Sequence, residues 1–129
     1  VSMVPFAVEP GSGQVVIHVS GLAVHTGNLQ RTPGASLLVA QTEVAGEPVH
    51  ALARVTLEGR AAVLETGSAP WSAARAAYLA RFPEAEPMTA LGDFRFVGIS
   101  VAGARQVAGF GAARSLDADA MAEVLRPKN

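Results

Sequence analysis

The chain has 129 residues and fits a single domain, since domains typically comprise about 100–200 residues. Its residues are 50% hydrophobic and 16% charged, and its formal net charge is −1, which excludes a disordered tail and argues against nucleic-acid binding. The absence of cysteine excludes disulfides and thiolate chemistry.

The first part of the chain predicts a β-hairpin. Residues 1–10 read as a strand in which Pro5, which has no amide donor, takes an edge or bulge position. A turn at 11–13 and a second strand at 14–20 complete the hairpin. Because the sequence begins within the first strand, we expect that its extreme N-terminal segment is missing. We find neither a signal peptide nor an apolar run of the about 20 residues that a membrane span needs, so we expect a cytoplasmic protein without membrane contact.

A polar loop follows the hairpin. Residues 25–34 are too polar for a strand, and Thr26 could cap one helical turn that ends at Pro33-Gly34. A third strand is predicted at 35–44, where apolar residues resume.

A long strand and a helix are predicted next. In the strand at 50–65, Gly59 indicates a bulge, and alternation places three apolar side chains on one face: Ala53, Val55 and Leu57. The alanine-rich helix that follows begins at Ser68 or Ser72 and ends at Phe82-Pro83. Three of its side chains form a stripe that we expect to pack on the barrel: Trp71, Arg75 and Tyr78.

The C-terminal part predicts a last hairpin and a short helix. The hairpin joins strands at 93–101 and 104–111 through a turn at 102–104. The helix at 116–127 is amphipathic and is capped by Asp117, and three side chains are expected to face inward: Met121, Val124 and Leu125. Together these elements predict a mostly β fold, a small six-stranded antiparallel barrel with one or two flanking helices.

Three catalytic or cofactor signals are weak. The glycines at 109–114 suggest a nucleotide loop, but the βαβ unit and distant acidic residue that such a loop requires are absent. The three histidines lack metal-ligand spacing, so no metal site is predicted. A triad using Ser20 and His25 lacks a nucleophile elbow, which argues against hydrolysis.

The polar cluster from Ser20 to Asn28 has two interpretations. It is either an ordinary loop, in which Thr26 and Asn28 bond the local backbone, or an anion-binding cradle. In the second interpretation, free amides, a hydroxyl and the imidazole of His25 together hold a phosphate. The residues alone leave both open.

Six segments occur in an order that resembles a known family: SMVPFAVE, IHVSGLAVHTGNL, ASLLVA, RVTLEGRA, YLARFP and DFRFVGISVAGARQVAGFGAAR. They resemble the FMN-binding split-barrel family related to pyridoxamine 5'-phosphate oxidase, in the branch that includes haem-utilisation proteins. The resemblance covers nearly the whole chain. It implies that residues 1–129 form one split-barrel domain, which forms a homodimer with FMN sites at the interface.

The resemblance also implies residue roles. Val4, Pro5 and Phe6 would lie along the isoalloxazine ring, and Arg54 falls where the oxidases place a polar side chain near the flavin, which in a dimeric site can come from the partner protomer. The ribityl chain and phosphate would be held by Ser20, His25, Thr26 and Asn28. No catalytic residue is assigned.

Three positions depart from the family pattern. Ser2 and Ala7 stand where the oxidases carry Arg and Lys, and Gly34 stands where relatives carry Arg. The leading hypothesis is therefore an FMN-binding protein, an oxidoreductase whose substrate is unknown, rather than a pyridoxamine phosphate oxidase. One alternative is a haem- or tetrapyrrole-binding protein on the same scaffold, and another is a non-catalytic barrel that has lost its cofactor. For haem, the axial ligand would come from one of three residues: His18, His25 or His50.

Overall fold

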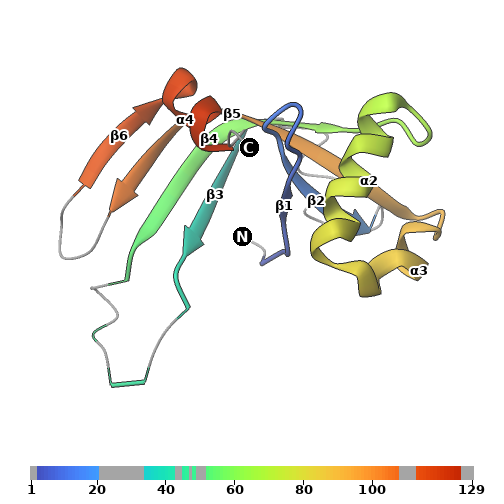
Figure 1. The fold of residues 1–129 in the computed structure, drawn as a ribbon, viewed down its shortest axis with the longest axis horizontal. Coiled ribbons are helices and arrows are strands. Elements are labelled where there is room, and N and C mark those ends of the chain that lie inside the picture. Colours follow the sequence, from blue (N-terminus) through green and yellow to red (C-terminus); the bar gives the residue numbers. More distant parts are fainter. Residues whose placement is uncertain are drawn as a thin grey trace.

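The computed structural model describes residues 3–20, 34–42, 45–46, 48, 52–107 and 113–125. In these residues, six strands form one antiparallel sheet, and three helices and a 3-10 turn flank it (Figure 1), which confirms the predicted mostly β barrel. The elements are β1 (Ala7–Val8), β2 (Val15–Ser20), β3 (Gly34–Ala40), β4 (Arg54–Val63), α2 (Ala69–Arg81), η2 (Pro83–Ala85), α3 (Glu86–Thr89), β5 (Phe94–Val107), β6 (Ala113–Asp117) and α4 (Ala118–Leu125). None of the described helices is long and apolar enough to cross a membrane.

The N-terminal hairpin is confirmed, but its first strand is short. β1 pairs with β2 only at Ala7 and Val8, and Gly13 turns the chain with a left-handed φ of 74°. The longer strand expected over residues 1–10 is wrong for residues 3–6, which lie outside the ladder. Pro5 explains part of this difference, because its ring nitrogen cannot donate to a neighbouring strand.

β5 is the strand that connects the two halves of the sheet. Its first residues pair with β2, its last residues pair with β6, and β4 pairs along its other side. The predicted turn at 102–104 is therefore wrong, because these residues continue the strand. Gly103 pairs with both Glu58 and Asp117, and a Cβ there would lie 3.3 Å from the Leu116 carbonyl oxygen. The small residues thus permit close approach of β6 rather than a turn.

The predicted bulge in β4 is confirmed. The pairing of β4 with β5 shifts register between Glu58 and Gly59. A Cβ at Gly59 would overlap the Ser100 carbonyl oxygen, so only glycine fits this close approach. The predicted alternation is also confirmed, since Val55 and Leu57 pack in the core on one face of the strand.

The two faces of the sheet bury two separate hydrophobic clusters. The barrel core lies on the inner face and includes Val15, Ile17, Val19, Leu57, Ala61, Val97, Ile99, Ala104 and Met121. The helix core lies between the sheet and α2 and comprises Ala7, Val16, Ala74, Tyr78 and Phe96. Alternate residues of β2 contribute to each cluster, as the period of a strand requires.

The long helix forms where it was predicted. Ser68 caps α2, because its hydroxyl accepts a hydrogen bond from the Trp71 amide at 3.3 Å, and the helix ends at Phe82. Trp71 and Tyr78 pack on the helix core, which confirms the predicted stripe. Arg75, the third member, donates from Nε to Thr89 Oγ1 at 3.2 Å and joins α2 to α3.

The C-terminal helix is confirmed with one error. Asp117 caps α4, because its Oδ1 accepts a hydrogen bond from the Ala120 amide at 2.9 Å. Met121 is buried and Leu125 packs against the barrel core, but Val124 is 62% exposed and not inward as expected. The third predicted strand, 35–44, also ends early, since β3 stops at Ala40.

Candidate ligand-binding cleft

A cleft opens where the sheet fails to close. The strand order runs β1-β2-β5-β4-β3, so β1 and β3 are its outer strands, and the N-terminal end of the described chain lies between them (Figure 1). The cleft has a volume of about 650 Å³ and lies between residues 3–6 and β3. This volume is within the range of about 300–1,000 Å³ typical of small-molecule sites.

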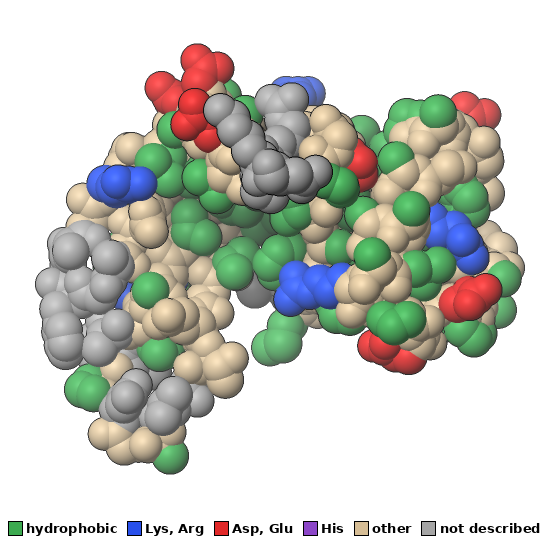
Figure 2. Space-filling view, in the orientation of Figure 1, with side chains coloured by type: hydrophobic (Ala, Val, Ile, Leu, Met, Phe, Trp, Pro, Cys, Tyr) green, Lys and Arg blue, Asp and Glu red, His purple; other side chains and the backbone are tan. Residues whose placement is uncertain are grey.

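The lining of the cleft is mostly apolar. Its residues are Met3, Val4, Phe6, Val15, Ser36, Leu37, Leu38, Val39, Ala40 and Thr56. Figure 2 shows hydrophobic side chains gathered in the hollow between the β3–β6 part of the molecule and the α2 part. Such a surface suits a ligand with a large apolar plane, because burying that plane removes apolar area from water.

Few polar groups line the cleft, and one of them is already engaged. The Ser36 hydroxyl donates to Glu58 Oε2 at 2.7 Å, across the β3–β4 ladder. Thr56 also belongs to the lining, and its hydroxyl has no hydrogen-bond partner among the described residues. The described lining contains no charged side chain.

Two of the three predicted residues of the N-terminal segment line this cleft. Val4 and Phe6 lie in its wall and pack against the barrel core, whereas Pro5 is exposed and is not part of the lining. Burial alternates along residues 3–6 although the segment has no ladder partner. Val4 and Phe6 therefore line a cavity, and their contact with a planar ligand stays a prediction.

Arg54 lies beside the cleft rather than in it. Its ladder partner Ala40 belongs to the lining, and so does Thr56, two residues further on the same face of β4. The Arg54 guanidinium donates to the Leu52 carbonyl oxygen at 3.2 Å.

Ser20 lies far from Arg54 within one chain. Ser20 pairs with Phe94 and Arg54 pairs with Val107, at opposite ends of β5. Val15, at the other end of β2, lines the cleft, and Ser20 is about 17 Å further along the strand at 3.3–3.4 Å per residue. The structure thus brings Val4, Phe6 and the neighbourhood of Arg54 together, but not Ser20.

The remaining predicted residues lie outside the described part of the chain. These are His25, Thr26 and Asn28, with His50 and the segment 108–112. The interpretation of the polar cluster as a loop or as an anion cradle therefore stays a prediction, as does the short helical turn expected at Thr26.

His18 is placed away from the cleft. It stands on the face of β2 that packs under α2, and its ring lies against three aromatic rings, with centroid distances of 4.4 Å to Phe96, 5.1 Å to Phe94 and 5.6 Å to Tyr78. Burial lowers the pKa of the His18 imidazole, because the charged form loses its hydration. Within the described part of the chain, a role as axial ligand in the cleft is thus unsupported for His18.

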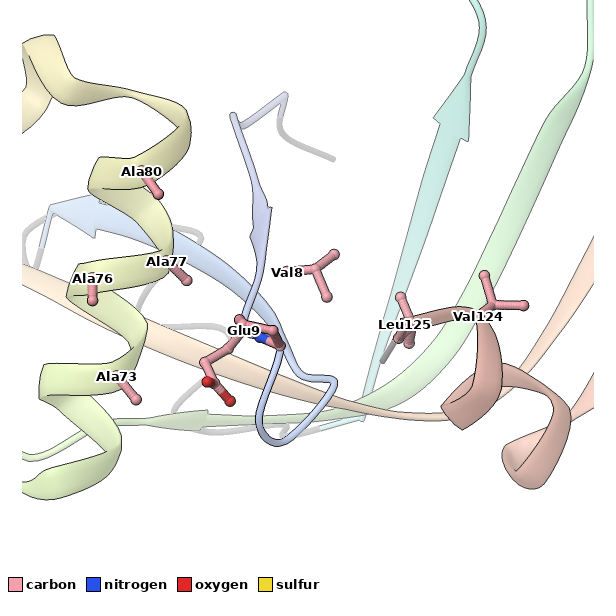
Figure 3. A pocket seen from close by; sticks show the side chains of 9 residues that line it. Val8, Glu9, Ala73, Ala76, Ala77, Ala80, Val124 and Leu125 are labelled. Atoms are coloured by element: carbon pink, nitrogen blue, oxygen red, sulfur yellow. The ribbon is translucent and has the colours of Figure 1, made fainter. Parts of the chain in front are cut away.

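A second hollow was missed by the sequence reasoning. Figure 3 shows alanines of α2 on one side, Val124 and Leu125 of α4 on the other, and Val8 and Glu9 between them. The groove has a volume of about 740 Å³. Its signal was present in the sequence as a helical stripe of small residues: Ala73, Ala76, Ala77 and Ala80.

Comparisons with known proteins point to one family. Residues 1–122 match the family model described as CREG, beta-barrel. The chain is 39% identical over 108 residues to the non-canonical haem oxygenase HOZ, chloroplastic, of Arabidopsis thaliana, a match that covers 84% of this chain and 31% of that protein. The chain thus spans about a third of this curated relative.

Two solved structures of haem proteins are similar to this chain. A haem-binding protein from Mycobacterium smegmatis is similar with a TM-score of 0.82 and 33% identity, over 94% of this chain and 48% of that one. HutZ, the haem storage protein from Vibrio cholerae, is similar with a TM-score of 0.68 and 25% identity, over 76% of this chain and 68% of that one.

Proposed function

Because the chain belongs to the CREG β-barrel family, we propose that it binds haem in the cleft between residues 3–6 and β3. The apolar cleft at the split of the sheet is the observation that carries the proposal. Relatives whose names state haem binding or haem storage support it. A porphyrin is a broad apolar plane, and burial against Val4, Phe6 and Leu37 would be driven by the hydrophobic effect.

The residues in and beside the cleft could supply some of the polar partners that haem needs. Thr56 belongs to the lining, and Arg54 lies next to the lining residue Ala40. The Arg54 guanidinium donates to the Leu52 carbonyl oxygen and has further donors that could pair with a ligand carboxylate. The iron, when bound, would supply a coordination site for an imidazole. His25 and His50 are the histidines left for that role, since His18 faces α2.

FMN is the second candidate ligand. Val4 and Phe6, the residues that the resemblance placed along a flavin ring, do line the cleft. However, FMN carries a phosphate dianion, and the described lining provides no cation for it. Tight FMN binding would therefore depend on the cluster at Ser20, His25, Thr26 and Asn28, and a flavin-dependent reaction would depend on that binding.

A second copy of the chain is the proposed partner. β3 is an outer strand among the described strands of the sheet, and the edge of an outer strand can offer backbone groups to another chain. Leu38 is 69% exposed on it and Met3 is 98% exposed across the cleft. A homodimer that covered these side chains would bring Arg54 of one protomer toward the cleft of the other. Sedimentation velocity would test this assembly.

The proposal concerns binding and does not extend to cleavage of haem. The oxygenase relative is matched over 31% of its length, so its whole activity is not transferred to this chain. For an oxidoreductase activity with flavin, likewise, no acid, base or nucleophile is assigned among the described residues.

Absorbance titrations test the proposed ligand. Protein titrated with haemin should develop a shifted Soret band and saturate at a fixed stoichiometry, whereas FMN should bind more weakly. An Ala40→Phe substitution should weaken haem binding by about tenfold or more, a change of about 1.4 kcal/mol, because the larger ring fills the cleft. Ala62→Phe is the matched control, since Ala62 is also an exposed strand alanine but lies outside the lining.

The outcomes separate the candidates. If the wild-type protein shows no Soret shift, the haem proposal is wrong. If FMN binds tightly and haem does not, the flavin hypothesis takes its place. If Ala62→Phe weakens binding as much as Ala40→Phe does, the ligand is bound elsewhere on the molecule.

A further inference from the structure

Arg81 joins the end of α2 to the wall of the cleft. Its guanidinium Nη1 donates a hydrogen bond to the Phe6 carbonyl oxygen at 2.8 Å. The guanidinium carbon also lies 4.7 Å from the centroid of the Phe6 ring and 5.1 Å from that of Phe82. One side chain therefore contacts both the backbone and the ring of Phe6, which are 75 positions away in sequence.

The segment that Arg81 holds has little other support. Residues 3–6 precede the two-residue strand β1 and lie outside the ladder. Among the described residues, the bond from Arg81 is the only side-chain hydrogen bond that reaches this segment. Its apolar side chains Val4 and Phe6 pack on the barrel core, yet Met3 and Pro5 are exposed. Without Arg81, the position of this wall would depend on two partly buried side chains.

We propose that Arg81 is a positioning residue for ligand binding, which acts by fixing Phe6 and hence one wall of the cleft. This inference rests on the proposed ligand-binding function. Arg81 itself does not line the cleft, so its effect reaches the ligand only through Phe6. The guanidinium suits the role because it can donate to a carbonyl while its plane lies over an aromatic ring.

The position of Arg81 at the end of α2 restrains its contact with Phe6. Arg81 is the last residue of α2, and the Phe82 amide closes the helix by donating to the Tyr78 carbonyl oxygen at 2.8 Å. Tyr78 is buried in the helix core, which anchors this end of the helix to the sheet. Arg81 thereby connects the cleft wall to the helix core. A cation also interacts favourably with the partial negative charge at a helix C-terminus.

The test compares three variants of the full chain. Arg81→Gln removes the charge and both cation–ring contacts. Arg81→Lys keeps the positive charge but replaces the guanidinium by a single ammonium group. Arg75→Gln is the matched control, because it removes another arginine from α2, whose side chain donates to Thr89 and, among the described residues, makes no hydrogen bond to the cleft wall. Each variant is measured by amide hydrogen exchange of residues 3–7, by haem affinity and by the urea midpoint of unfolding.

We expect Arg81→Gln to accelerate exchange in residues 3–7 by about tenfold and to weaken haem binding several-fold, while its urea midpoint stays near that of Arg75→Gln. A tenfold change corresponds to about 1.4 kcal/mol. Arg81→Lys should restore part of both losses. Arg75→Gln should leave exchange in the segment and haem affinity unchanged.

Several results would overturn the inference. Unchanged exchange in Arg81→Gln would show that Arg81 does not order the segment. Faster exchange with unchanged haem affinity would remove the positioning role while leaving the proposed function intact. If the wild-type protein bound no haem, the proposed function would fail, and the exchange comparison alone would decide whether Arg81 fixes this wall.

Discussion

The imidazole of His18 stacks on the ring of Phe94, with 5.1 Å between centroids and 24° between planes. This pair closes one end of the aromatic cluster beneath α2, which also contains Phe96 and Tyr78. The described residues offer the imidazole no hydrogen-bond partner, and its ring lies against aromatic rings instead.

The stability of the protein should therefore fall in mild acid. Burial lowers the pKa of folded His18 below its usual 6.5, so the unfolded chain binds a proton that the folded chain resists. The contribution of His18 to the free energy of unfolding is fully present above pH 6.5 and is lost as the pH falls from 6.5 through the folded pKa. Urea midpoints measured at pH 8 and pH 5.5 (about 1.5 units above and about 1 unit below the ordinary histidine pKa) should show this decrease.

His18→Phe isolates this contribution from that of the other histidines. The variant keeps an aromatic ring but cannot be protonated, so its midpoint should depend less on pH than that of the wild type. An identical pH dependence in the two proteins would assign the effect to other groups.

Gly59 should be intolerant of any side chain. Gly59→Ala places a Cβ onto the Ser100 carbonyl oxygen, and backbone must move to relieve the overlap. We expect a loss of about 1–3 kcal/mol in the free energy of unfolding, as for other overpacked sites. Gly92→Ala is the control, since nothing lies within 4 Å of a Cβ there. Equal losses in the two variants, measured by urea unfolding, would contradict the observed bulge.

Phe96 should be the most costly aromatic side chain to truncate. It is 1% exposed, is among the largest fully buried side chains, and contacts Trp71 edge-on at 6.0 Å. Phe96→Ala should lower the free energy of unfolding by about 3–5 kcal/mol. It should also change the fluorescence of Trp71, the single tryptophan of the chain.

An exposed apolar position provides the comparison for Phe96. Val124→Ala should cost less than about 0.5 kcal/mol, because Val124 is 62% exposed. A cost similar to that of Phe96→Ala would mean that α4 is buried by something outside the described residues.

The Glu9 carboxylate should stabilise the first hairpin only when ionised. Its oxygens accept hydrogen bonds from the Ser12 hydroxyl at 2.6 Å and from the Gly11 amide at 2.9 Å, and the Ser12 side chain is the main cause of its lowered pKa. The contribution is present above the ordinary value of 4.5 and is lost as the pH falls through the folded pKa. Glu9→Gln should lower the thermal midpoint at pH 7 and leave less difference from wild type at pH 3 (about 1.5 units below the ordinary glutamate pKa). A difference that grew on acidification would contradict this role.

Local sequence signals were sufficient to predict those features that neighbouring residues determine. The limits of α2 follow from Ser68 and Pro83, and the bulge follows from Gly59. In contrast, Gly103 resembles a turn residue, and only the approach of β6 from later in the chain explains why it lies within a strand. Local propensity cannot distinguish these two uses of glycine.

The candidate site was predictable only through resemblance. Nothing in periodicity places Phe6 across a cleft from Leu37, because Phe6 precedes β1 and Leu37 lies in β3, at opposite ends of the strand order. Arg81 gave no signal at all, since a basic residue in the last turn of a helix is common. Its contact with Phe6 depends on the arrangement of α2 on the finished sheet.

The pairing of β2 with β5 also sets the order in which the protein can fold during synthesis. Val15 finds its partner in Ile99, and Ser20 finds its partner in Phe94, so the second strand must wait for most of the domain to leave the ribosome. Until then, the apolar run of β2 has only the two rungs of β1 beside it. Until β5 has been synthesised, β2 therefore lacks its main partner strand, and such transiently exposed apolar strands are prone to aggregate and are the reason that chaperones exist.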